Sequence, residues 1–65
     1  IDAAVPVLIA LVQGDGNTLV RQAAAWGLGR INGEDARAAL LQAQSSETES
    51  QVLDAIEVAL RMNRR

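Results

Sequence analysis

The charged side chains of this 65-residue chain are eight carboxylates and six arginines, and the chain contains no His and no Cys. Without imidazole or thiol groups, a His-based triad, a zinc site and thiol chemistry are excluded. The carboxylates are spread over expected helix caps and outer faces, where they cap helices or face solvent. They are Asp2, Asp15, Glu34, Asp35, Glu47, Glu49, Asp54 and Glu57. We therefore expect no enzyme activity, no catalytic residue, no metal and no cofactor.

The segment from Gly27 to Gly33 resembles a dinucleotide-binding loop only in its glycine content. Its glycine spacing differs from that of the dinucleotide fingerprint, and it is expected to end a helix. The C-terminal end of a helix dipole repels phosphate. We therefore predict no nucleotide site here.

The arginines do not form a phosphate-binding surface. The net charge is −2, Lys is absent, and Arg64-Arg65 is the single basic cluster. A nucleic-acid-binding face normally carries a basic stripe, whereas two terminal arginines suit a helix C-terminus or a frayed tail. The longest apolar run, residues 3–12, is interrupted by Pro6 and is about half a membrane span. We expect neither nucleic acid nor membrane as a partner, and the lack of Cys is typical of the cytoplasm.

Start and stop signals predict an all-α chain of four helices. Ala is abundant, Phe and Tyr are absent, and Trp26 is the only aromatic residue, which favours helix over strand. Asp2 caps a first helix that runs to about Gln13. Asn17 caps a second helix, which begins at Thr18 and stops at Asn32-Gly33, where Gly takes the left-handed conformation without a steric cost.

The second half of the chain repeats this plan. A third helix follows from about Glu34 to Ala43. Thr48 and Gln51 then form a capping box for a fourth helix, which ends near Met62. Short connections force successive helices to run antiparallel.

Each predicted helix places its apolar residues on one inward face. These faces consist of Val5, Leu8, Ile9 and Val12; Val20, Ala24, Gly27, Leu28 and Ile31; Leu40 and Leu41, flanked by Ala36, Ala39 and Ala43; and Val52, Ile56, Ala59 and Leu60. In the second helix, the small residues Ala23, Ala24 and Gly27 allow a neighbouring backbone to approach closely. Gly27 and Gly29 each cost about 1 kcal/mol in a helix interior, which indicates a packing reason for at least one of them.

An internal repeat is the strongest pattern in the sequence. At an offset of 32 residues, Asp15 falls on Glu47, Val20 on Val52 and Leu28 on Leu60. A repeat of this length, in which neither helix pair buries its apolar face alone, predicts an α-solenoid segment. We therefore expect one domain over residues 1–65, with repeats over 1–32 and 33–65.

The segment from Asp15 to Arg21, followed by Ala24 to Gly29, resembles the HEAT-like repeats of the phycobilin lyase type. The pattern of that family is D-x-[DN]-x-x-V-R-x-x-A-A-x-A-L-G, and residues 4–8 resemble its A-V-P-x-L helix start. The resemblance implies right-handed stacked helix pairs with an Asp–Arg ladder between repeats. In the second repeat, Leu53 stands in place of the Arg and Glu57 in place of an Ala.

The same resemblance implies mostly protein-binding roles. One subset of the family acts with phycobilin lyases or isomerases, and another binds iron through His-Glu pairs, which this chain cannot form because it has no His. If the chain were an accessory or subunit of a chromophore lyase, Arg21, Arg30 and Trp26 would be its candidates for holding a bilin. We carry this role as the alternative to a non-catalytic interaction or scaffolding module.

Five residues on two helices form a candidate protein-binding surface. Leu19, Trp26 and Arg30 follow one flank of the second helix, and Val58 and Met62 hold matching positions in the fourth. Two interpretations remain open. Trp26 packs between the repeats while Val58 and Met62 await another repeat or a second copy, or Trp26 and Arg30 anchor a partner.

The ends of the segment carry further apolar residues. Ala4, Val7 and Leu11 form a second apolar stripe on the first helix, so Val7 and Leu11 join the candidate surface. Exposed apolar ends of a solenoid favour stacking. We expect a homo-oligomer or the neighbouring repeats of a longer chain; a purely structural spacer is a third possibility.

Overall fold

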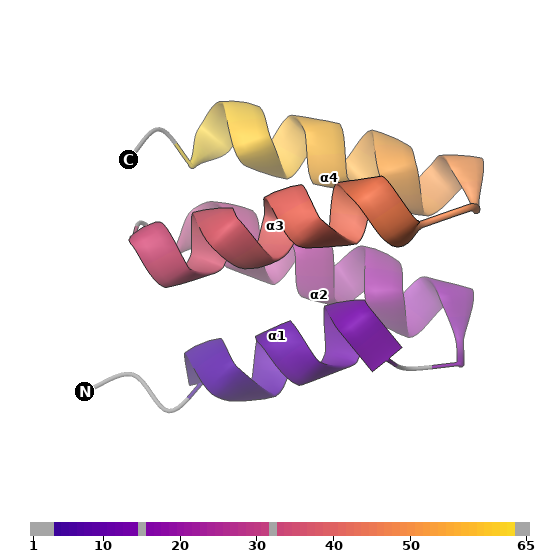
Figure 1. Cartoon of the computed structure of the whole chain (residues 1–65), viewed down its shortest axis with the longest axis horizontal. Helices are drawn as coiled ribbons and strands as arrows, with labels where there is room; N and C mark the ends of the chain where they lie inside the picture. The colour runs from indigo at the N-terminus through magenta and orange to yellow at the C-terminus, as the bar shows by residue number, and fades with distance from the viewer. Residues whose placement is uncertain (1–3, 15, 32, 64–65) are drawn as a thin grey trace.

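The computed structural model describes residues 4–14, 16–31 and 33–63, and these ranges form four α-helices without a strand. The helices are α1 (Ala4–Gly14), α2 (Thr18–Arg30), α3 (Glu34–Ser46) and α4 (Ser50–Met62). Successive helices alternate in direction, so α1 and α3 run one way while α2 and α4 run the other (Figure 1). The all-α prediction is confirmed. None of these helices is long and apolar enough to cross a membrane.

The helices pack as two pairs with a shared core, and the first pair is α1 with α2 while the second is α3 with α4. The core consists of Val12, Ala24, Ala25, Leu28, Ala36, Ala39, Leu40, Ala43, Val52, Ala55, Ile56 and Ala59. Leu8, Ile9, Leu11 and Leu60 pack against its edge. Alanines make up much of this buried set, so the core depends on close helix approach as well as on large side chains.

Helix α2 contacts α1 on one side and α4 on the other. A Cβ added at Gly27 would meet the side chain of Leu8 in α1 at 3.1 Å. A Cβ added at Gly29 would lie 2.7 Å from both Cα and Cβ of Ala59 in α4, so no side chain fits there. The prediction of a packing reason for one of these glycines is confirmed at Gly29. The prediction that Ala23 lies on the close-packed side is wrong, because Ala23 is exposed.

Helix α3 differs from its prediction in length and in orientation. It extends past Ala43 to Ser46, and in its last turn the hydroxyl of Ser45 donates to the carbonyl of Gln42. The prediction that Leu41 faces inward is wrong, since its side chain is 46% exposed. The buried face consists of Leu40 and the alanines expected on the flank, which places Leu41 beyond its edge.

The cap predictions have mixed outcomes. The N-cap at Asn17 is confirmed, since its Oδ1 accepts from the backbone N–H of Leu19 at 2.8 Å. The capping box of Thr48 and Gln51 is wrong, because α4 follows Glu49 without a side-chain cap. Gln51 Nε2 instead donates to Gln22 Oε1 at 3.3 Å.

The end of α2 also differs from the prediction. The helix ends at Arg30, and the C-cap residue Ile31 donates its N–H to the carbonyl of Leu28. Gly33 precedes α3 as its N-cap, with φ 147° and ψ 159°. It therefore has a positive φ, as expected for Gly, but it starts the next helix and is not a left-handed helix end. The predictions for Asp2, Asp15, Asn32 and Arg64-Arg65 lie outside the described residues.

Candidate functional site

Four of the seven predicted surface residues line one groove between α2 and α4. Trp26 and Arg30 come from α2, and Val58 and Met62 come from α4. The groove has a volume of about 240 Å³. Because α2 and α4 run in the same direction and their bounds differ by 32 residues, equivalent positions of the two helices meet there.

The side chains of this groove are only partly covered. Trp26 is 48% exposed and Met62 is 46% exposed. Trp26 therefore forms part of the groove wall, and about half of its side-chain surface remains exposed to solvent. Arg30 is exposed in the last turn of α2. The ion pair found among the described residues joins Arg21 to Glu47 and does not involve Arg30. The groove thus combines apolar surface with a cation that no described carboxylate neutralises.

The other three predicted surface residues lie elsewhere. Leu19, at the start of α2, is 65% exposed, and Val7 on α1 is 59% exposed. Leu11 packs against the edge of the core and is not a free surface residue. None of the three lines the groove.

Arg21 occupies a separate site at the opposite end of α2. Its Nε donates to Glu47 Oε1 at 2.9 Å and its Nη2 donates to Glu47 Oε2 at 3.1 Å. The hydrogen bond from Arg21 is the main cause that lowers the pKa of Glu47. Desolvation raises this pKa, whereas hydrogen bonds from the backbone N–H groups of Glu49 and Thr48 lower it further. Arg21 and Trp26 line different pockets, so the three candidates for a bilin do not form one site.

The geometry can be compared with known families. A family model of HEAT repeats matches residues 2–61. The chain belongs to the HEAT repeat family. HEAT repeats generally mediate protein–protein interaction or scaffolding, and the family is generally non-enzymatic. The match confirms the HEAT-like resemblance and carries no information on the phycobilin lyase type. Comparison with curated proteins and with solved structures gives no match.

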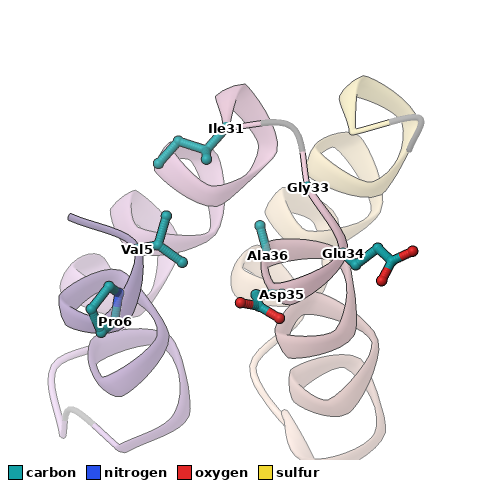
Figure 2. Close-up of a pocket in the computed structure, with 7 residues that line it drawn as sticks. All are labelled: Val5, Pro6, Ile31, Gly33, Glu34, Asp35 and Ala36. Carbon is teal, nitrogen blue, oxygen red and sulfur yellow. The ribbon is translucent and has the colours of Figure 1, made fainter. Parts of the chain in front are cut away.

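Another pocket of this HEAT segment lies where α1, α3 and the end of α2 come together (Figure 2). Its volume is about 390 Å³, and it is lined by Val5, Pro6, Ile31, Gly33, Glu34, Asp35 and Ala36. The side chain of Glu34 points away from α1. Glu34 and Asp35 both lie in the first turn of α3, where the helix dipole stabilises their negative charge. No group of three acidic, His or Cys side chains that could hold a metal occurs in the described ranges. This pocket therefore combines the apolar side chains of Val5, Pro6 and Ile31 with two carboxylates at the start of α3.

One buried polar residue of the HEAT segment has no signal in the sequence. Asn63 is fully buried and donates from Nδ2 to the carbonyl of Ile31 at 3.0 Å, while its own carbonyl accepts from Arg37 Nη1 at 2.9 Å. It thereby ties the end of α4 to the end of α2 and to α3. At the repeat offset Asn63 corresponds to the apolar Ile31, so the repeat pattern predicts no such role.

Proposed function

We propose that this HEAT segment is a non-catalytic module that binds a protein partner through the groove of Trp26, Arg30, Val58 and Met62. One observation supports the proposal most strongly. An exposed aromatic residue and an exposed cation from α2 meet exposed apolar residues from α4, in a family that generally mediates protein interactions. We place its action in the cytoplasm, consistent with a chain that has no Cys.

The chemistry of the groove defines the kind of segment that fits it. Trp and Arg carry much of the energy of protein interfaces, and Met adapts its shape to a ligand. An apolar side chain of the partner would cover the half-exposed faces of Trp26, Val58 and Met62. A carboxylate next to it would pair with Arg30, which no described carboxylate neutralises. The preferred ligand is thus a protein segment with an Asp or Glu beside a large apolar residue.

Selection from an unbiased library of displayed peptides tests this proposal. We expect enriched sequences to combine a large apolar residue with a neighbouring Asp or Glu. Binding should be lost in Trp26→Ala and in Arg30→Glu but kept in Leu41→Ala, which removes an equally exposed apolar residue on α3. Enriched peptides that bind all three variants equally would refute the assignment of the groove.

The emission of Trp26 gives a second readout, because it is the only Trp of the chain. A selected peptide that covers the indole should shift this emission to shorter wavelength and saturate with concentration. Adding a free bilin tests the alternative role as a lyase subunit in the same assay. A saturable change in the bilin spectrum would favour the lyase role over the peptide-binding role.

A further inference from the structure

The interface between the two helix pairs has two different sides. On the first pair, the side that faces α4 is the stripe Arg21, Ala25 and Gly29, spaced four residues apart on α2. Arg21 pairs with Glu47, Ala25 is fully buried, and Gly29 lets Ala59 approach closely. We call this stripe the donor stripe.

On the second pair, the facing residues are Gln51, Ala55 and Ala59 of α4, also four residues apart. Gln51 bonds to Gln22, Ala55 is buried, and Ala59 meets Gly29. We call this set the acceptor stripe. Small residues on both stripes let the two helices approach each other at backbone distance.

The repeat offset of 32 residues shows where each stripe recurs on the outer surfaces of the segment. The acceptor stripe recurs on the first pair as Leu19, Ala23 and Gly27. Leu19 and Ala23 are exposed there, and Val7 of neighbouring α1 is exposed as well. This outer face is therefore apolar and rich in small residues, like the equivalent face that the first pair covers on the second.

On the second pair, the positions that correspond to the donor stripe carry different residues. Leu53 stands in place of Arg21, Glu57 in place of Ala25 and Arg61 in place of Gly29. Glu57 and Arg61 are both exposed. Because Gly29 tolerates no side chain at its contact, an arginine at the same place prevents an equivalent approach of a further helix. The terminal repeats of a helical array carry a polar outer face, and Glu57 and Arg61 supply two charged residues to this one.

We propose that the segment is directional: its face of Val7, Leu19 and Ala23 receives one further HEAT helix pair, whereas its face of Glu57 and Arg61 is a cap. The helix pair that fits is one whose second helix carries a donor stripe with the spacing of Arg21, Ala25 and Gly29. A second copy of this chain does not fit, because its donor stripe is already covered by its own second pair. This inference is independent of the groove that binds a partner.

Two fusions of the full chain test the directionality. In the first, a duplicate of residues 1–32 precedes the chain, which places a donor stripe against the exposed acceptor face. In the second, a duplicate of residues 33–65 follows the chain and meets Glu57 and Arg61. We expect the first fusion to unfold in one transition with a higher urea midpoint and a slope about half as large again, because the slope grows with the surface exposed. The second fusion should keep the midpoint of the parent chain, and its added pair should be cut rapidly by protease.

Point variants make the result specific. Ala23→Glu at the exposed acceptor face should abolish the gain of the first fusion and leave the parent chain unchanged, because Ala23 is exposed. Leu53→Arg, Glu57→Ala and Arg61→Gly together should allow the added pair of the second fusion to dock. Equal stabilisation by both fusions, or none by the first, would overturn the proposal. Sedimentation of the parent chain as a dimer that Leu19→Glu dissociates would also overturn it, in favour of a second copy.

Discussion

Arg21 Nε lies 2.9 Å from Glu47 Oε1, and this ion pair joins α2 of the first helix pair to the residues that lead into α4 of the second. Glu47 Oε2 also accepts from the backbone N–H groups of Thr48 and Glu49. One carboxylate therefore links the two pairs and holds the turn before α4. Glu47 corresponds to Asp15 at the repeat offset, so both repeats carry an acidic residue at this position.

The first prediction concerns the pH dependence of this pair. Arg21→Gln should lower the free energy of unfolding at pH 7 by about 1–3 kcal/mol, because it leaves a largely buried carboxylate without its charged partner. The folded pKa of Glu47 lies below its ordinary value of 4.5, so the contribution is present above that pH and is lost as pH falls through the lowered pKa.

Urea unfolding at several pH values measures this effect. The difference between the native chain and Arg21→Gln should narrow below pH 4.5. Arg61→Gln, which removes an exposed arginine at the far end of α4, should show little difference at any pH. A difference for Arg21→Gln that does not change with pH would contradict the role of this ion pair.

The second prediction concerns the contact between α2 and α4. Gly29→Ala should destabilise the fold by about 1–2 kcal/mol, since overpacking against Ala59 exceeds the gain in helix propensity. Gly14→Ala is the matched control, because nothing lies within 4 Å of an added Cβ there. Thermal melts followed by circular dichroism measure the difference in stability between the two variants. A Gly29→Ala variant more stable than the parent chain would mean that α2 and α4 can separate at little cost.

Much of the fold follows from local patterns in the sequence. The four helices, the N-cap at Asn17 and the end of α4 near Met62 all depend on residues close in the chain, and the structure confirms them. The groove could be anticipated because the repeat places Trp26 and Val58 at equivalent positions of parallel helices.

The features that the sequence did not predict depend on contacts between distant residues. Leu41 and Ala39 both fit an amphipathic pattern, and only the packing of α3 decides which of them is covered. Gln51 fits a local cap by its spacing, yet Gln22 on another helix is its partner. Asn63 is buried because two helix ends converge on it, which no local pattern indicates.

The third prediction tests the orientation of α3 with two adjacent leucines. Leu40→Ala should cost about 2–5 kcal/mol, since Leu40 is fully buried. Leu41→Ala should change stability by no more than about 0.5 kcal/mol, because Leu41 is exposed. Urea unfolding of both variants measures the contrast. Similar losses from the two substitutions would mean that α3 is rotated about its axis so that both leucines are covered.

The fourth prediction uses one substitution at two sites with opposite roles. Asn63→Asp should destabilise the fold at pH 7 by about 1–3 kcal/mol, because Asn63 donates to the carbonyl of Ile31 and a carboxylate cannot. Asn17→Asp should be neutral or stabilising, because Asn17 accepts from backbone N–H groups at a helix N-terminus. Equal losses in thermal melts of the two variants would show that Asn63 does not act as a donor.

The central claim is that the groove between α2 and α4 binds the protein partner, and backbone NMR of the full chain with a selected peptide tests it most directly. We expect the amide shifts to change around Trp26, Arg30, Val58 and Met62, and we expect these changes to vanish in Trp26→Ala. Amides near Val7 on α1 and Leu41 on α3 should stay in place. Changes centred on Val7 and Leu19, with the groove unaffected, would contradict the claim and assign partner binding to the face that we propose for a further helix pair.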